Sequence, residues 1–361
     1  MTNARRYFLY TEVATRFWAT EKEGEGMCAK KIRFYGHPQL PFEEWEPSYV
    51  DQGKVNPGQS GYTDLDITPA DLAADKVSER NLHFISLGSG SSGNCCYIGS
   101  KRGGILIDAG VKTEDVVRML SSNGISMNSV KALLLTHDHS DHVRYAYNIV
   151  RNHKHIRIFC TNRVLGGILR RHSISKRIKE YHNPVFKEIP FRILDFEITA
   201  FEVPHDGTDN MGFSIEFDNR HFVLATDLGA VTDRARYYMS RANYLVIEAN
   251  YDLQMLKYGP YPEYLKARIQ TDNGHMDNEA TGAFLKEIVN PDLKYVFLCH
   301  LSKDNNTPSK ALKAVRDALE SAGKVVGNAS ESILDRKADI QLMALPRFES
   351  SRLFVFRGVV S

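Results

Sequence analysis

The segment that decides the fold is Thr136-His137-Asp138-His139-Ser140-Asp141-His142, directly after the apolar run Ala132-Leu133-Leu134-Leu135. It holds three of the 13 histidines of the chain. Because side chains alternate along an extended turn, His137 and His139 can point to the same side. A helix that begins after them brings Asp141 and His142 to a second, nearby point. The segment therefore offers ligands to two metal ions, and its mixture of imidazole and carboxylate suits zinc, manganese or iron.

Three further polar residues follow later strand-like runs. His205 comes after the run 198–203, Asp227 after 222–225 and His300 after 295–299. A single histidine in such a place is more often structural than a ligand. Three metal-ligating residues at the same place after successive strands favour one shared site, because open α/β sheets keep their sites at the carboxyl ends of strands.

The apolar pattern from residue 81 to 361 predicts two strand-rich blocks, each with helices after its strands. Strands are expected at 82–87, 95–98, 105–107, 130–135, 156–159, 193–203, 211–217, 221–225, 244–248 and 295–299. Helices are expected at 113–120, 141–152, 233–239, 278–288 and 308–322. We therefore expect an α/β (α+β) domain with two packed sheets and helices outside. Residues 1–80 carry Gly, Pro and acids without periodicity, which predicts an irregular or disordered extension.

Composition narrows the class of protein. The five cysteines are odd in number and include no CxxC pair, so we expect buried free thiols and neither disulfides nor a thiolate zinc site. No apolar run is long enough for a membrane span. The N-terminus mixes charges such as Arg5 and Arg6 into its apolar residues, unlike a signal peptide. A soluble, cytoplasmic protein is expected.

The segment 137–142, followed by His205, Asp227 and His300, resembles the ligand pattern of the metallo-β-lactamase superfamily. The resemblance implies an αβ/βα four-layer sandwich with two packed mixed β-sheets. It also implies one metal on His137, His139 and His205, a second on Asp141, His142 and His300, and Asp227 between the two. Asp108 in Leu106-Ile107-Asp108-Ala109-Gly110 resembles the first motif of that family, an acid behind the metal ligands.

Several motifs resemble the bacterial YycJ (WalJ)-like proteins of that superfamily. They are Ser89-Gly-Ser-Ser-Gly-Asn94, Ile247-Glu-Ala-Asn-Tyr-Asp252, Asp272-Asn-Gly-His275 and His300-Leu-Ser-Lys-Asp-Asn-Asn306, besides the segment 136–142. The similarity begins at about residue 82 and runs to the end of the chain. Asp277 is a mild departure, because the pattern more often has a small hydroxyl residue there. Members of this group are regarded as exonucleases that degrade DNA from 5′ ends.

Two elements are similar to the tRNA-processing ribonuclease Z branch. Gly274-His275 precedes a predicted helix, and Glu248-Ala249 follows a predicted strand. The similarity implies that His275 donates a proton to the leaving oxygen or holds the scissile phosphate, while Glu248 orients it. The plain alternative for Glu248 is an acid at the entry to a helix. Together with Asp141, these two residues form the candidate catalytic set.

A basic tract at 144–192 carries twelve Lys and Arg residues but only two acids, although the net charge of the chain is +2. Phosphate backbones bind such surfaces through counterion release. The alternative is an ordinary solvated surface with acids nearby in space. Arg170 and Arg171 are the candidate phosphate contacts of the tract. The resemblance adds the loop residues Ser91, Ser92, Asn94, Lys303 and Asn305.

These features predict a di-metal hydrolase that acts as a DNA exonuclease, with a hydroxide held between two divalent ions (Zn or Mn, with Fe also suitable). The alternative is a hydrolase of small thioesters or lactones, because the same metal site serves those esters in other branches. The basic tract and the Gly274-His275 element favour the nuclease. A binding protein with a degenerate site ranks last, because all seven ligand positions are filled. The metal, the direction of digestion and the choice between DNA and RNA stay open at this level.

Overall fold

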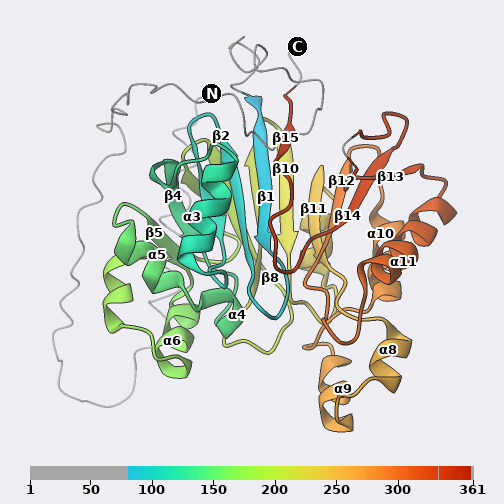
Figure 1. Ribbon diagram of the computed structural model, residues 1–361, viewed down its shortest axis with the longest axis horizontal. Helices are drawn as coiled ribbons and strands as arrows, with labels where there is room; N and C mark the ends of the chain where they lie inside the picture. Colours follow the sequence, from blue (N-terminus) through green and yellow to red (C-terminus); the bar gives the residue numbers. More distant parts are fainter. Residues whose placement is uncertain (1–79, 332, 359–361) are drawn as a thin grey trace, which may run out of the picture. The chain divides into compact units, whose positions relative to one another are not determined.

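The computed structural model describes residues 80–331 and 333–358, and two β-sheets form its centre (Figure 1). One is seven-stranded, in the order β15 (Phe354–Phe356), β1 (Leu82–Gly88), β2 (Cys95–Ser100), β3 (Gly103–Ile107), β4 (Val130–Leu134), β5 (Arg157–Cys160) and β6 (His182–Pro184). The other is eight-stranded, in the order β13 (Val326–Asn328), β14 (Ile340–Ala344), β12 (Tyr295–Cys299), β11 (Tyr244–Glu248), β10 (Arg220–Ala225), β9 (Met211–Phe217), β8 (Phe196–Glu202) and β7 (Phe191–Ile193). Both sheets mix parallel and antiparallel pairs.

The two sheets pack face to face through large aromatic side chains. The ring of Phe84 on β1 lies 4.9 Å from the rings of both Phe222 on β10 and Phe297 on β12, measured between centroids. All three side chains are fully buried. Aromatic side chains bury a large apolar area each, so this layer supplies much of the hydrophobic stabilisation. The expected sandwich of two packed mixed sheets is thereby confirmed.

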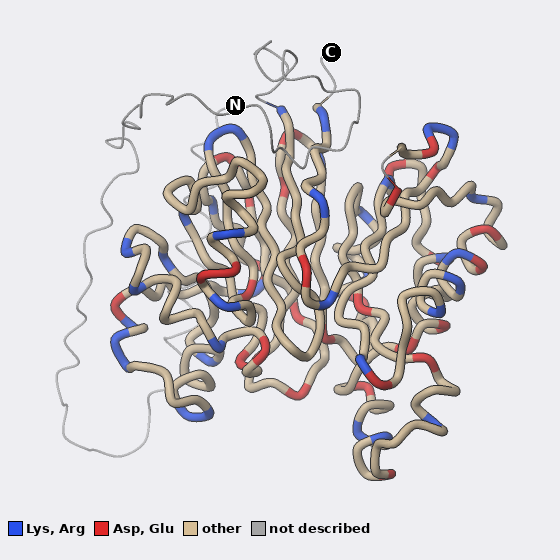
Figure 2. Tube along the Cα trace, in the orientation of Figure 1, with Lys and Arg blue, Asp and Glu red and all other residues tan. Residues whose placement is uncertain are grey.

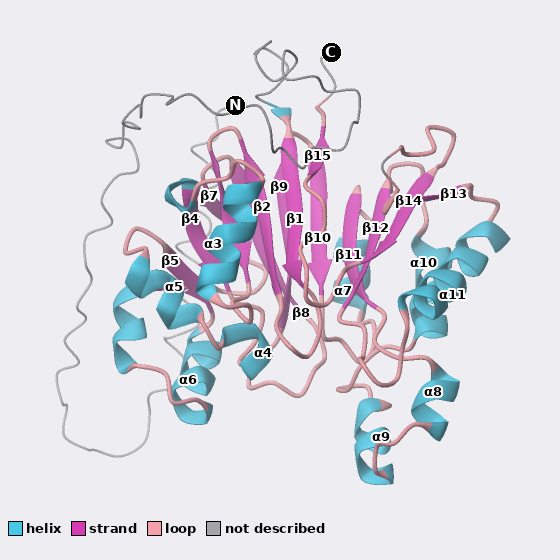
Figure 3. Cartoon of the chain, viewed as in Figure 1, coloured by secondary structure: helices cyan, strands magenta, loops and turns pink. Residues whose placement is uncertain are grey.

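Helices cover the outer faces of both sheets (Figure 3). Those on the side of the seven-stranded sheet are α3 (Thr113–Ser122), α4 (Ser140–Val143), α5 (Ala146–Asn152) and α6 (Asn162–Arg171), with the short 3₁₀ helices η3 (Met127–Ser129) and η4 (Lys176–Tyr181). Those of the eight-stranded sheet are α7 (Asp233–Met239), α10 (Asn278–Ile288) and α11 (Pro308–Ser321). Within the described residues, no helix is long and apolar enough to cross a membrane.

Two expected elements are each divided in the structure. The single helix expected at 141–152 is α4 and α5, interrupted at Arg144 and Tyr145. The reason is competition for backbone groups: the Asp141 carbonyl accepts from the Asn94 N–H, and the Tyr145 N–H donates to the Ala109 carbonyl. The single strand expected at 193–203 is β7 and β8, joined by a turn in which Leu194 has φ 56°.

Three helices of the structure had no signal that predicted them, and one predicted segment lies outside the described residues. Helices α6, α8 (Leu253–Tyr258) and α9 (Glu263–Ile269) were not expected. The strands at 244–248 and 295–299 and the helices at 233–239 and 278–288 have the expected bounds. Apart from Arg80, the predicted extension at 1–80 lies outside the described residues.

His83 on β1 makes stability dependent on pH. Burial lowers the pKa of His83 to about 4. In the unfolded chain the pKa of this histidine is near 6.5, so between pH 4 and pH 6.5 the unfolded chain binds the proton more readily than the folded protein. The free energy of unfolding therefore keeps the full contribution of neutral His83 above about pH 6.5 and decreases as the pH falls towards 4. We expect His83→Gln to remove about 2 kcal/mol of this decline between pH 7.5 and pH 5.

The measurement is the free energy of unfolding of both proteins at pH 7.5 and pH 5. Other groups also titrate in this range, so the informative quantity is the difference between the two declines. Equal declines in the wild type and the variant would contradict the role assigned to His83.

Candidate metal centre

The candidate metal ligands meet where the carboxyl ends of strands from both sheets come together, at the lower side of Figure 1. His137 follows β4, and His205 follows β8. Asp227 and His300 follow the parallel strands β10 and β12, and Glu248 is the last residue of β11 between them. Sites at the carboxyl ends of strands are the rule for open α/β sheets.

The structure brings these side chains into overlapping groups whose ligand atoms lie within 4.8 Å of one another. The groups are His137, His139 and His205; Asp141, His142 and His300; His137, His142 and Asp227; and Asp227, Glu248, His275 and His300. The first two have the membership expected for the two metals. All seven positions expected to bind metal are thus gathered at one place.

Asp227 lies between the first two groups. Its Oδ2 is 3.1 Å from His142 Nε2, and its Oδ1 is 3.1 Å from His300 Nδ1. Oδ1 is also 3.9 Å from His205 Nε2. Asp227 thus has carboxylate oxygens beside imidazoles of both groups.

The donor atoms suit divalent cations. His137 Nε2 and His300 Nε2 are buried and have no hydrogen-bond partner within residues 80–331 and 333–358. Buried polar atoms are almost always paired, so two orphaned imidazole nitrogens among carboxylates call for a cation. Three imidazoles in one group, and two imidazoles with a carboxylate in the other, are the ligand types that zinc, manganese and iron accept.

Asp108 holds His142 from behind. Its carboxylate accepts from the Thr136 N–H at 2.9 Å and lies 2.7 Å from His142 Nδ1. The opposite nitrogen, Nε2, thereby points at Asp227. A carboxylate behind a histidine sets the tautomer and raises the basicity of a metal ligand. This geometry is the one the resemblance implies for Asp108.

Three residues of the centre adopt the left-handed backbone conformation, which costs energy for any residue other than glycine. Asp108 has φ 62°, Asp227 has φ 52° and His300 has φ 54°. Asp108 and His300 directly follow β3 and β12, and Asp227 stands two residues after the end of β10. Backbone strain of this kind gathers at functional sites, where the surrounding structure holds it in place.

Glu248 orients two histidines at once. It is fully buried, and its Oε1 lies 2.7 Å from His275 Nδ1 and 2.9 Å from His300 Nδ1. Its Oε2 accepts from the backbone N–H groups of Leu228 and Met276. A helix-entry acid would cap a helix, whereas Glu248 makes no such bond and α10 is capped by Asp277.

Electrostatics divide the histidines into two kinds. Burial and the neighbouring His142 lower the pKa of His137 well below its ordinary value. Burial also opposes the charged form of His142, but Asp227 and Asp108 outweigh it and raise that pKa well above its ordinary value. Burial likewise opposes the charged form of His300, but Asp227, Asp141 and Glu248 together outweigh it and raise that pKa to about 10. A cation that enters the centre must displace the protons held there.

Three residues that the sequence reading missed support the centre. Asp138 is fully buried and accepts from the Thr208 N–H at 2.8 Å, which ties the loop of His139 to the loop after His205. Asn250 donates to the His300 carbonyl at 2.7 Å. Asp206 lies 3.2 Å from His139 Nε2. Asp138 and Asn250 stand inside quoted motifs, so a signal existed for them.

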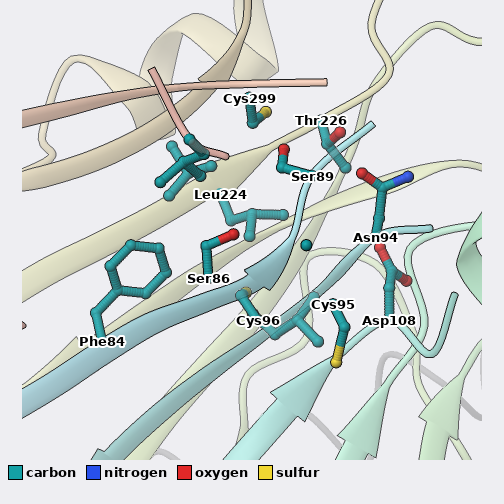
Figure 4. Close-up of a pocket in the computed structure, with 14 residues that line it drawn as sticks. Phe84, Ser86, Ser89, Asn94, Cys95, Cys96, Asp108, Leu224, Thr226 and Cys299 are labelled. Carbon is teal, nitrogen blue, oxygen red and sulfur yellow. The ribbon is translucent and has the colours of Figure 1, made fainter. Parts of the chain in front are cut away.

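A small cavity lies between the sheets behind the centre (Figure 4). Its volume of about 30 Å³ is enough for about one water molecule. Asn94, Asp108 and Thr226 line it together with Cys95 and Cys299. Burial raises the pKa of both thiols, so they stay protonated. All four cysteines in the described residues are free and buried, as expected.

The candidate substrate contacts are placed unequally. Ser91 and Ser92 are exposed in the loop after β1, and Lys303 is exposed in the loop after β12. Asn94 is buried, with Nδ2 2.9 Å from His142 Nε2. Asn305 is fully buried and bonds to Ser302, so it supports the loop and has no surface to offer a substrate.

The basic tract reaches the centre only in part. Lys and Arg gather on the side formed by α5 and α6 (Figure 2). Arg171 at the end of α6 lies 3.5 Å from Asp138, and Arg163 donates to the Thr208 carbonyl, so both adjoin loops of the centre. Arg177 and Arg192 instead pair with the nearby acids Glu180 and Glu197. These two arginines therefore fit the alternative of an ordinary solvated surface.

Comparisons with known proteins agree with this geometry. Residues 104–300 match the family model described as the Beta-lactamase superfamily domain. The chain therefore belongs to the β-lactamase superfamily and is a metal-dependent hydrolase.

Within this superfamily the chain is a YycJ-like protein. It is 32% identical to the exodeoxyribonuclease YycJ of Bacillus anthracis, over 69% of this chain and 94% of that protein. It is 31% identical to the exodeoxyribonuclease WalJ of Streptococcus pneumoniae, over 70% of this chain and 93% of that protein. Among solved structures, the metallo-β-lactamase fold protein YhfI of Bacillus subtilis matches with a TM-score of 0.53 at 13% identity, over 77% of this chain and 100% of that chain, which shows the fold.

Proposed function

We propose that the protein is an exodeoxyribonuclease that hydrolyses phosphodiester bonds at the centre formed by His137, Asp227 and His300. The observation that carries the proposal is the pair Glu248 and His275 beside the two ligand groups. Ester hydrolysis at phosphorus needs a nucleophile, charge neutralisation and a proton for the leaving alkoxide, and this arrangement has a group for each. The relatives named exodeoxyribonuclease support DNA as the substrate.

His137, His139 and His205 would hold one divalent ion, and Asp141, His142 and His300 the other, with Asp227 between them. When bound, two such ions supply a hydroxide at neutral pH and neutralise the charge of the phosphate. Zinc and manganese are the ions that we propose, with iron as the further fit to these ligands.

His275 would protonate the leaving oxygen. Its ring lies 5.0 Å from that of His205 and 5.2 Å from that of His300, measured between centroids, so it borders both ligand groups. Burial opposes its protonation, but Glu248 outweighs burial and raises the pKa of His275. The imidazole is thereby kept protonated closer to neutral pH, as a general acid requires. Water then takes the place of the leaving alcohol on phosphorus, and the products are a phosphate monoester and a free hydroxyl.

The competing function is the hydrolysis of thioesters or lactones. Thioester hydrolysis expels a thiolate, which is a good leaving group and needs no protonated imidazole, whereas lactone hydrolysis expels an alkoxide, as phosphodiester hydrolysis does. The hydrolysis of a thioester or a lactone also needs no positive charge beside the centre, where Arg163 and Arg171 lie. The leaving group thus favours a phosphodiester over a thioester, and the arginines favour it over both alternatives.

The test is digestion of duplex DNA labelled at the 5′ or the 3′ end, with manganese or zinc. We expect the wild type to shorten the DNA progressively, a chelator to stop it and added metal to restore it. The label that is released first gives the direction of digestion.

The control is the double variant Asp141→Ala/His142→Ala, which loses two ligands of one group and is expected to be inactive. A wild type that carries two metals by elemental analysis and leaves DNA intact would refute the nuclease. The thioester and lactone function would then take its place.

A further inference from the structure

A second cavity, of about 210 Å³, opens beside the centre and is walled by the unexpected helix α9. On the centre's side it is lined by Asp206 and His275. On the far side it is lined by Tyr261, Arg268 and further residues of the α8–α9 segment. The α8–α9 segment projects beyond the strand ends at the lower right of Figure 1. A substrate that reaches His275 therefore passes next to α9.

Helix α9 carries an exposed aromatic ring one turn before Arg268, the cation that lines this cavity. Tyr264 is 78% exposed, an unusual state for a large ring. It stands four residues before Arg268, so the two side chains are neighbours on the surface of α9. Arg268 is 61% exposed, and its Nε and Nη2 bind Asp206. Within residues 80–331 and 333–358, its Nη1 has no acceptor, so one edge of the guanidinium remains for a ligand.

Tyr261 provides a second ring inside the cavity. It is partly buried, and its hydroxyl donates to Asp304 at 3.2 Å, so its position is held by the loop after β12. Two tyrosines and a guanidinium on one short segment, next to an acid–base pair, match the chemistry of a single-stranded nucleic acid, in which bases stack on aromatic side chains while phosphates bind cations.

We propose that this cavity receives the terminal nucleotides of the strand that is being degraded, with a phosphate on Arg268 and a neighbouring base stacked outside the cavity on Tyr264, one turn earlier on α9. The inference rests on the proposed nuclease function and names a substrate subsite for it. The subsite lies on α9, whereas the basic tract expected from the sequence lies on the side of α5 and α6. It would bind an unpaired end, because stacking requires an unpaired base.

The test compares a single-stranded oligonucleotide with bis(p-nitrophenyl) phosphate, a diester too small to span the centre and α9. Loss of one stacking contact is worth about 1–3 kcal/mol. We therefore expect Tyr264→Ala to raise KM for the oligonucleotide about tenfold, with little change in kcat, and to lower the ratio of the two kcat/KM values accordingly. Tyr264→Phe keeps the ring and should restore KM. Arg268→Gln should raise KM and weaken its dependence on salt.

Tyr237→Ala is the matched control, since Tyr237 is a 47% exposed tyrosine on α7, outside the cavity. It should behave as the wild type with both substrates. An unchanged KM in Tyr264→Ala, or an equal loss with both substrates, would overturn the subsite while the nuclease stands. A wild type that digests no DNA would refute the nuclease itself, and the subsite with it.

Discussion

Asp227→Asn is expected to lower kcat/KM for DNA by about 10³-fold or more, because the charge between the two ligand groups is lost. The carboxylate of Asp227 is buried and reaches His142 and His300 at 3.1 Å each. Asparagine has the same shape and tolerates the left-handed backbone that Asp227 adopts at φ 52°. The fold should therefore survive, while metal content falls below that of the wild type.

The measurement combines kcat/KM, metal content by elemental analysis and thermal unfolding. Asp218→Asn is the matched control, because Asp218 also has a positive φ, 51°, but lies in the turn before β10, at the end of that strand opposite Asp227. The control should retain activity and metals. Full activity and two bound metals in Asp227→Asn would show that Asp227 is not a ligand of the metal centre.

The two-sheet fold and the candidate metal ligands could be predicted from the sequence, because local patterns of residues determine them. The two-sheet fold followed from apolar strands such as 244–248, whose residues are all buried. The candidate ligands were found because His137, Asp227 and His300 each follow such a strand, and strand ends converge in this kind of fold. The pairing of Glu248 with His275 came from resemblance, since nothing in the spacing of these residues predicts a contact of 2.7 Å.

The rest depended on contacts between distant parts of the chain. Helix 141–152 was expected to be continuous, yet Asn94 and Ala109 take over the backbone groups that would continue it. The α8–α9 segment carries Pro260, Pro262 and Gly259, which hid its two short helices. Asp206 is linked to Arg268 only through folding, so the cavity beside α9 had no signal in the sequence.

His275→Ala is expected to lower kcat for DNA by about 10²–10⁴-fold, the usual contribution of a general acid. His275 lies beside the ligand groups, and its Nδ1 is held by Glu248. The metal content should stay that of the wild type, because the groups around His137 and His142 remain complete. His221→Ala, at the start of β10 and away from the centre, is the control and should be fully active.

Substrates with different leaving groups distinguish the two possible roles of His275, as a proton donor or as a residue that binds the scissile phosphate. A p-nitrophenyl ester of a nucleotide releases p-nitrophenolate, which needs no proton from the enzyme. If the imidazole acts as the acid, His275→Ala should therefore hydrolyse this ester almost as fast as the wild type. Glu248→Gln should give an intermediate phenotype: because Glu248 raises the pKa of His275, its loss lowers that pKa, and the fall of activity at alkaline pH begins at a lower pH. If His275→Ala loses the same factor in kcat with DNA and with the p-nitrophenyl ester, and if Glu248→Gln leaves the alkaline side of the pH–activity profile unshifted, then His275 holds the scissile phosphate. Binding to the phosphate is needed whichever group departs.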